Sequence, residues 1–186
     1  MQEHIDPRQL IIDAKNGDTK AFGSLYELYY VPVFRYIYIR TTQRQLAEDL
    51  TQTVFVKAFE NIGRYQATAS PPLAYLFTIA RNSVIDHWKK KKDILFQEED
   101  AAVSNIPDHR QDIAHHAEIK SSADKIKEAI AQLPPDQQDV VTMKFINELN
   151  NKEIAETLGK SEDAIRQLQS RALKTLRANK QDYDIL

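Results

Sequence analysis

Cysteine is absent from the 186-residue sequence, and glycine is scarce, with four residues. The lack of cysteine excludes disulfides and thiolate metal sites. Few glycines and only seven prolines exclude collagen-like and low-complexity chains. No apolar run approaches the roughly 18 residues that a membrane span needs, and the amino end, MQEHIDPRQL, lacks the basic and apolar segments of an export signal. These absences predict a soluble cytosolic chain of one or two small domains.

A surplus of one charge sign is also missing, because 25 Lys and Arg stand against 27 Asp and Glu. Proteins that bind nucleic acid usually carry a basic surplus. The charges are, however, unevenly distributed: residues 1–92 hold 13 basic and 9 acidic side chains, whereas residues 93–133 hold 4 and 9. The net charge of -2 therefore does not exclude a nucleic-acid partner.

Apolar residues recur at helical spacing on both sides of a central segment, and no stretch alternates apolar and polar residues long enough for a strand. We therefore expect an all-α fold of two small helical domains. The central segment, 93–116, has no such period, and it carries Pro107 and clustered acids, which is typical of a linker. The predicted division is a first domain over 1–92, an acidic linker over 93–116 and a second domain over 117–186.

Helix signals divide the predicted first domain into four helices. Asp6 and Asp18 precede the first two as N-caps, and Pro32 is expected to kink the second. A third helix is expected from about Thr42 to Ile62 and a fourth after Ser70. The predicted inner stripe of the third helix consists of Leu46, Leu50, Val54 and Ala58.

The stretch NNKEIAETLGKSEDAIRQLQSRALKTLR shows two helices joined by a tight turn. Asn150 and Glu153 form a capping-box pattern, Gly159 supplies the turn, and Ser161 can cap the next helix. This is a helix-turn-helix pattern, whose second helix can enter the DNA major groove. Its predicted outer face consists of Arg166, Gln167, Ser170, Arg171, Lys174 and Arg177. Arg, Gln and Ser can read base edges, but similar hairpins also occur in packing roles, so both interpretations stay open.

Two further polar surfaces are expected in the first domain. The third helix turns Glu48, Asp49, Gln52 and Lys57 away from its apolar stripe, toward solvent or a partner. The fourth helix and the preceding loop bring basic and aromatic groups together, which suits single-stranded DNA. These groups are Arg64, Tyr65, Gln66, Arg81, Asn82, Asp86, His87, Trp88, Lys89 and Lys90. A core tryptophan followed by solubilising lysines is the alternative interpretation.

Catalytic and metal-binding patterns are missing. The sequence has no phosphate-binding loop, no dinucleotide fingerprint and no H-E-x-x-H. His115 and His116 are adjacent, so a helix would turn them to different sides, and no third ligand lies at regular spacing. Glu48 and Asp49 likewise diverge by about 100 degrees on a helix, which is unsuited to shared acid–base work. We expect no enzyme activity, no cofactor, no metal and no small-molecule substrate.

Four blocks, in this order, carry a resemblance to a known family: AEDLTQTVFVKAF, PPLAYLFTIARNSVIDHWKKK, LPPDQQDVVTMKF and KEIAETLGKSEDAIRQLQSRAL. They resemble a bacterial RNA polymerase sigma factor of the sigma-70 family, in particular its two-domain extracytoplasmic-function (ECF) group. The resemblance extends from about Asp18 to Arg177. It implies a sigma factor that binds core RNA polymerase and directs promoter-specific transcription initiation.

The resemblance also implies site residues in both domains. In the first domain, the positions that match the polymerase-binding segment are Glu48, Asp49, Leu50, Gln52, Phe55 and Lys57. The positions that match the minus-ten reader, including the loop 63–69, are Arg64, Tyr65, Arg81, Asn82, Asp86, His87 and Lys90. In the second domain, the positions that match the minus-thirty-five reader are Arg166, Gln167, Ser170, Arg171 and Lys174.

The implied partners are core polymerase, through the clamp helices of its largest subunit and the flap of its second-largest subunit, and promoter DNA. The linker resembles a segment that threads the basic RNA channel of polymerase, where its acidic charge imitates nucleic acid. The family implies a cytoplasmic protein, nucleoid-associated on polymerase or held at the inner membrane by an anti-sigma factor. Departures at Glu148–Asn151 and Asp163–Ala164 leave the upstream promoter sequence open.

Two other classes of function remain to be weighed. A stand-alone helix-turn-helix regulator would bind a palindrome as a dimer without polymerase, although it would not need the block from AEDL to WKKK. An all-helical scaffold or enzyme would show no salt-dependent affinity for DNA.

Overall fold

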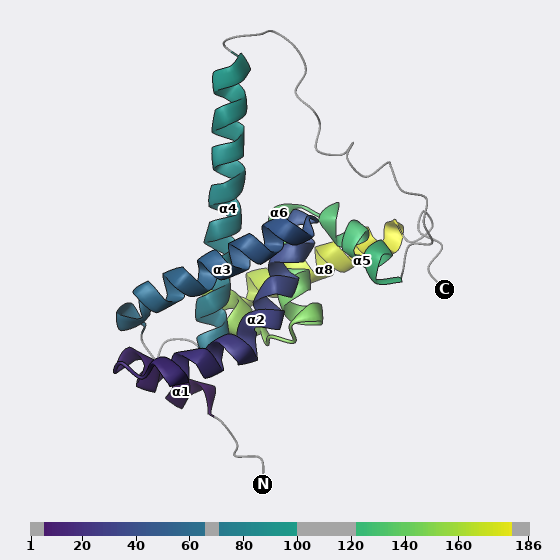
Figure 1. Ribbon diagram of the computed structural model, residues 1–186. Helices are drawn as coiled ribbons and strands as arrows, with labels where there is room; N and C mark the ends of the chain where they lie inside the picture. The colour runs from purple at the N-terminus through teal and green to yellow at the C-terminus, as the bar shows by residue number, and fades with distance from the viewer. Residues whose placement is uncertain (1–5, 66–70, 100–121, 180–186) are drawn as a thin grey trace.

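The computed structural model describes residues 6–65, 71–99 and 122–179 (Figure 1). Over these ranges the regular structure is helical, and no strand is present. The prediction of an all-α fold is therefore confirmed.

The first half of the molecule consists of α1 to α4. Its helices are α1 (Pro7–Lys15), α2 (Thr19–Thr41), α3 (Arg44–Glu60) and α4 (Pro72–Glu99), with a short 3-10 helix at Ile62–Arg64. Asp6 and Asp18 accept hydrogen bonds from backbone N–H groups in the first turns of α1 and α2, at 2.9 and 2.8 Å for the shortest bond of each. These capping residues begin the two helices as the sequence predicts.

The buried face of α3 includes Val54 and Ala58, as predicted, but it departs from the predicted stripe in the first half of the helix. Leu46 and Leu50 are only half-buried, and the fully buried residues are Ala47, Thr51, Val54, Phe55 and Ala58. The polar Thr51 is buried without penalty because its hydroxyl donates to the Ala47 carbonyl at 2.6 Å. The prediction was wrong for Leu46 and Leu50 because it gave the leucines more weight than the small residues that allow helices to approach closely.

Helix α4 extends beyond its predicted end. It runs to Glu99, so the first seven residues of the predicted linker, 93–99, are helical. No Pro or Gly occurs between residues 73 and 99, and a helix can continue without an apolar face where it leaves the core. Figure 1 shows this end of α4 projecting beyond the other helices. The rest of the predicted linker lies outside the described residues.

The second half of the molecule consists of α5 to α8. Its helices are α5 (Ser122–Ala131), α6 (Pro135–Val141), α7 (Asn151–Leu158) and α8 (Glu162–Ala178), with a π-helical turn at Thr142–Ile146. The predicted capping box is present, because Glu153 N–H donates to Asn150 Oδ1 at 3.0 Å and Asn150 N–H donates to Glu153 Oε2 at 2.8 Å. Gly159 has φ +62°, a left-handed conformation that glycine adopts without strain, and it turns the chain from α7 into α8.

The two halves share one hydrophobic core. A continuous cluster joins Tyr36 and Phe77 of the first half to Val140, Met143 and Ile154 of the second half. At its centre, the rings of Tyr36 and Phe77 meet edge to face, with 5.3 Å between their centroids. Helix α4 packs against α7, and α2 packs against α5 and the π-helical turn. The two predicted helical domains are therefore present as the two halves, and they pack closely against each other.

Candidate nucleic-acid interface

Helix α8 presents a polar face to solvent. Its buried residues are Ile165 and Ala172, which face α6 and α7, and Ser161 caps its first turn by accepting from Ala164 N–H at 3.2 Å. The exposed side chains are Arg166, Gln167, Ser170, Arg171, Lys174 and Arg177. The predicted orientation of this face is confirmed. The role of each side chain in reading DNA stays a prediction.

Two contacts set the position and charge of this face. Gln169 Nε2 donates to Asn151 Oδ1 at 2.9 Å, which ties α8 to α7. The Arg166 guanidinium bonds to Asp163 and pairs with Glu162 at 3.7 Å, and the hydrogen bond and charge of Asp163 raise the pKa of Arg166. These carboxylates orient Arg166. A DNA base would have to displace them before it could bind the guanidinium.

The turn before α7 has a strained position. Glu148 has φ +59°, in the left-handed region where a side chain costs roughly 1–2 kcal/mol. Position 148 therefore has a backbone conformation that glycine adopts without strain, although a glutamate stands there.

The predicted minus-ten residues of the loop lie in different environments. Arg64 is exposed, but Tyr65 is only 3% exposed, with its ring 5.2 Å from that of Tyr75. Lys15 Nζ also donates to the Tyr65 carbonyl at 2.9 Å. The Tyr65 ring is therefore part of the core under α1 in this structure and is not exposed to a base, and its predicted role in the minus-ten reader stays a prediction. The loop residues 66–69 lie outside the described residues.

Helix α4 places its predicted DNA-binding residues on two sides. Asn82, Asp86 and Lys90 are exposed, whereas His87 and Trp88 are half-buried. Trp88 packs against the shared core and has Lys91 Nζ 5.5 Å from its ring centre. The core interpretation of Trp88 is therefore the better one, and the exposed part of this surface is polar.

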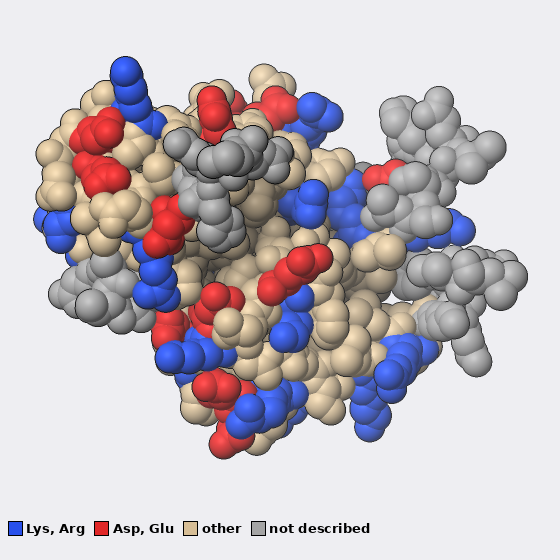
Figure 2. Space-filling view, turned by 90° about the horizontal axis from the view of Figure 1, so that it is seen from below, with Lys and Arg blue, Asp and Glu red and all other residues tan. Residues whose placement is uncertain are grey.

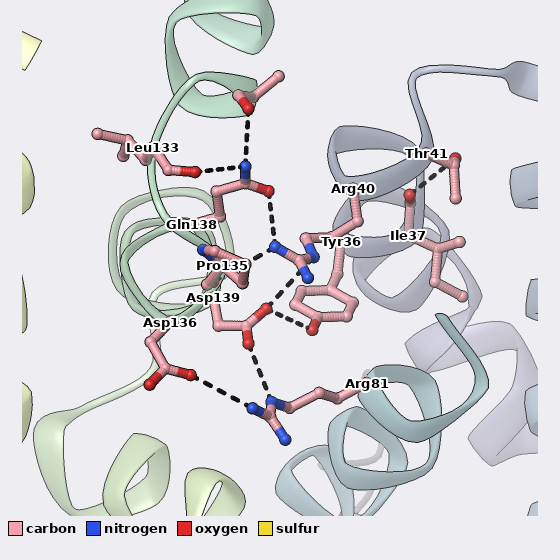
Figure 3. A network of polar contacts seen from close by, with 11 residues as sticks. Tyr36, Ile37, Arg40, Thr41, Arg81, Leu133, Pro135, Asp136, Gln138 and Asp139 are labelled. Atoms are coloured by element: carbon pink, nitrogen blue, oxygen red, sulfur yellow. Dashed lines mark hydrogen bonds and ion pairs between the residues drawn. The ribbon is translucent and has the colours of Figure 1, made fainter. Parts of the chain in front are cut away.

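Arg81 faces the second half of the molecule (Figure 3). Its Nε donates to Asp139 Oδ2 at 2.9 Å, and its terminal NH2 group donates to Asp136 Oδ1 at 3.3 Å. Partial burial lowers the pKa of Arg81, but the hydrogen bond and charge of Asp139 more than offset this, so the pKa lies above its ordinary value. In this arrangement Arg81 is bound by carboxylates and is not available to DNA.

Asp139 is the centre of a buried polar cluster, the Asp139 cluster, formed with Tyr36, Arg40 and Arg81. Its side chain is 1% exposed, and it accepts a hydrogen bond from the Tyr36 hydroxyl at 2.7 Å. The Arg40 Nε lies 3.5 Å from the same carboxylate oxygen as an ion pair. Burial, followed by the charge of Asp139, raises the pKa of Tyr36 well above its ordinary value. Sequence reasoning missed this cluster, since its members lie far apart in the chain.

The predicted polymerase-binding residues of α3 are only partly exposed. Asp49 and Gln52 are exposed, and the half-buried members are Glu48, Leu50 and Lys57. Phe55 is 4% exposed and packs on Tyr26, with 4.8 Å between ring centroids. Phe55 is therefore a core residue in this structure, not a residue of the outer surface.

Sequence reasoning missed a group of exposed apolar side chains on α2 and α3. These side chains are Tyr26, Leu28, Val31, Val56 and Phe59. The last two lie on the same helix as Asp49 and Gln52. Their exposure was not predictable because the apolar pattern of α2 continues around most of the helix. Large apolar residues with a polar surrounding are typical of protein-binding surfaces.

Charges of both signs are interspersed on the face seen from below (Figure 2). Among the described residues visible on this face, acidic side chains lie between the basic ones, so they form no broad basic region of the kind that attracts duplex DNA on its own. Among the described residues, no helix is long and apolar enough to cross a membrane, and no cluster of three or more His, Asp or Glu could hold a metal ion. His115 and His116 lie outside the described residues.

Two family models match the chain, Sigma-70 region 2 over residues 25–94 and Sigma-70 region 4 over residues 123–176. The ECF RNA polymerase sigma factor BldN of Streptomyces coelicolor is 35% identical over 170 residues, which are 90% of this chain. The alignment spans only 63% of BldN. The ECF RNA polymerase sigma factor SigM of Bacillus subtilis is 30% identical over 154 residues, which cover 83% of this chain and 91% of SigM.

Two solved structures share the fold. CnrH, in complex with the cytosolic domain of CnrY, matches with a TM-score of 0.72 and 20% identity over 97% of this chain and all of CnrH. The sigma factor RpoE from Bartonella quintana, in complex with the anti-sigma factor NepR, matches with a TM-score of 0.69 and 21% identity over 86% of this chain and 96% of RpoE. Taken with the two family models and the sequence relatives, the helix-turn-helix of α7 and α8 and the helical first half identify the chain as a member of the sigma-70 family of RNA polymerase sigma factors, in its extracytoplasmic-function group.

Proposed function

We propose that this chain binds core RNA polymerase and directs it to promoters, reading the minus-ten element with the first half and the minus-thirty-five element with the second. The observation that carries the proposal is the exposed polar face of α8, the second helix of the helix-turn-helix, which includes Arg166, Gln167 and Arg171. Regions 2 and 4 of the sigma-70 family match the two halves in the family's order. A stand-alone regulator would need only the second half.

The first half supplies the polymerase-binding surface in this proposal. Asp49 and Gln52 are exposed on α3 beside the exposed apolar residues Val56 and Phe59. Such a surface combines apolar contact area with polar groups that fix orientation, as protein interfaces do. We assign it to the clamp helices of the largest polymerase subunit, and we assign the flap of the second-largest subunit to the second half.

The DNA-binding roles follow from exposure and chemistry. The polar face of α8 would enter the major groove at the minus-thirty-five element. The exposed residues Asn82, Asp86 and Lys90 of α4 would contact the minus-ten element, where capture of a flipped base offsets a few kcal/mol of lost stacking and pairing. The polymerase would carry out all the chemistry, so we assign no catalytic residue to this chain, which would work in the cytoplasm under the control of an anti-sigma factor.

Replacing Arg166 or Lys174 with Ala distinguishes base reading from phosphate binding. If Arg166 reads a base, Arg166→Ala should weaken promoter use by roughly 10- to 100-fold and relax specificity at one position. If Lys174 contacts a phosphate, Lys174→Ala should weaken binding to all promoter sequences equally. It should also reduce by roughly 1 the slope of log affinity against log salt concentration. Transcription from a minus-thirty-five library at several salt concentrations measures both effects. If Arg166→Ala lowered transcription equally for every promoter sequence in the library, Arg166 would not read a base.

Retention of core polymerase tests the proposal. Immobilised full-length protein should retain purified core polymerase and should bind promoter DNA specifically only when polymerase is present. A folded protein that retains no polymerase would refute the proposal. Dimeric binding to a palindrome without polymerase would favour the stand-alone regulator instead.

A further inference from the structure

Helix α1 packs against the first residues of the predicted minus-ten loop. It precedes the segment that Sigma-70 region 2 matches, which begins at residue 25, and the proposed function gives it no role. Ile11 and Ala14 of α1 are buried in a cluster with Leu25 and Tyr65. Tyr65 directly follows the 3-10 helix Ile62–Arg64. The packing of α1 therefore fixes a side chain in the first part of the loop 63–69.

A second contact from α1 reaches the backbone of the same residue. Lys15 Nζ donates to the Tyr65 carbonyl at 2.9 Å, across 50 residues of sequence. The Tyr65 N–H donates to the Ile62 carbonyl at 3.0 Å. The N–H, the carbonyl and the ring of Tyr65 are thus each held by a separate contact, and α1 supplies two of the three.

The residue held in this way is the neighbour of an exposed basic side chain. Arg64 is exposed and is one of the predicted minus-ten residues. Its N–H donates to the Asn61 carbonyl at 2.9 Å, so Arg64 lies in the same short turn as Tyr65. A planar peptide joins the two residues, with about 3.8 Å between their Cα atoms. A shift of the Tyr65 backbone therefore also moves Arg64.

The bond from Lys15 affects the position of this turn more than the stability of the fold. Lys15 is exposed, and an exposed ammonium gives up hydration and side-chain freedom when it is held in one geometry. Its net contribution to folding is therefore small. The bond nevertheless selects one orientation of the Tyr65 carbonyl, because a carbonyl at a helix end otherwise bonds to water.

We propose that Lys15 is a positioning residue for minus-ten recognition: through the Tyr65 carbonyl it holds the turn that carries Arg64 in the orientation that binds the minus-ten element. This inference rests on the proposed function and adds α1 to the parts of the chain that determine promoter recognition. Lys15 itself contacts no DNA. It acts through the backbone of Tyr65, whose buried ring anchors the turn under α1.

Replacement of Lys15 with Met in the full-length chain tests this role, because Met has a similar length and no donor. The probe is a single-stranded DNA with the minus-ten element of a promoter that the wild type transcribes. With core polymerase, Lys15→Met should bind it about tenfold more weakly, an effect typical of a lost hydrogen bond to a charged group. Lys15→Arg keeps a donor and should recover most of the affinity. Lys20→Met, at an exposed lysine in the first turn of α2, should match the wild type.

Two further measurements separate positioning from a general effect on structure. The unfolding transition and the affinity for core polymerase should be the same in Lys15→Met as in the wild type. Wild-type affinity of Lys15→Met for the minus-ten strand would overturn the positioning role. A loss that Lys15→Arg does not reverse, or an equal loss in Lys20→Met, would also overturn it, and so would a lowered unfolding transition with weaker polymerase binding.

The wild-type chain separates this inference from the proposed function. If the wild type gives no transcript with core polymerase, the proposed function fails. An active wild type together with an unresponsive Lys15→Met refutes the positioning role alone.

Discussion

Replacing Phe77 with Ala is expected to lower the free energy of unfolding by about 3–5 kcal/mol. Phe77 is 0% exposed and lies at the centre of the core that joins the two halves, against the Tyr36 ring. Removal of the ring leaves a cavity that close-packed neighbours can only partly fill. The loss is a large fraction of the 5–15 kcal/mol that is typical of whole proteins. Denaturant unfolding followed by circular dichroism measures it.

The neighbouring residue provides the control for this variant. Thr78 is exposed, and its hydroxyl donates to the Ala74 carbonyl of its own helix at 3.0 Å. Thr78→Ala should change the free energy of unfolding by no more than about 0.5 kcal/mol. If Phe77→Ala behaved like Thr78→Ala, the description of a shared core centred on Phe77 would be wrong.

Replacing Asp49 with Arg should weaken binding of core polymerase by at least about 30-fold. Asp49 is exposed on α3 in the proposed polymerase-binding surface, and truncation of a hot-spot interface residue costs about 2 kcal/mol or more. Reversal of a charge adds repulsion between like charges, which costs several kcal/mol more when the groups face each other. Titration of labelled protein with core polymerase measures the dissociation constant.

A charge reversal on the second half shows whether any loss of polymerase binding is specific to the α3 surface or is a general effect of reversing a surface charge. Glu156 is an exposed carboxylate on α7, outside the α3 surface assigned to the clamp helices, so Glu156→Arg should weaken polymerase binding much less than Asp49→Arg does. Both variants should keep the wild-type unfolding transition, because exposed substitutions rarely change stability by more than about 0.5 kcal/mol. Leu50→Asp is a poorer test, since Leu50 packs against the core and its loss would affect folding. Wild-type affinity in Asp49→Arg would place the surface elsewhere.

Local signals in the sequence predicted the helices well. Caps act through neighbouring backbone groups, so Asp6, Asp18, Asn150 and Ser161 begin their helices as expected. The polar face of α8 was predictable for a similar reason, because a period of 3.6 residues alone determines which side chains share a face. These features depend on residues that are close in sequence.

Features that depend on tertiary packing were not predictable. The burial of Tyr65 depends on α1 and Tyr75, and the burial of Thr51 depends on close approach between helices. The Asp139 cluster unites α2, α4 and α6 across more than 100 residues of sequence for the bond from Tyr36 to Asp139. The only local signal of the Asp139 cluster was a charged residue at position 139 beside Val140 and Val141. Such a signal does not indicate which residues the charge contacts.

The central claim is that this chain turns core polymerase into a promoter-specific enzyme, and run-off transcription tests it most directly. Core polymerase, the full-length protein and a pool of the host's promoters should yield discrete transcripts that share upstream elements and that disappear when the protein is omitted. Asp49→Arg should reduce them, and Glu156→Arg should reduce them much less. The absence of specific transcripts, with folded protein and polymerase that is active with another sigma factor, would contradict the account.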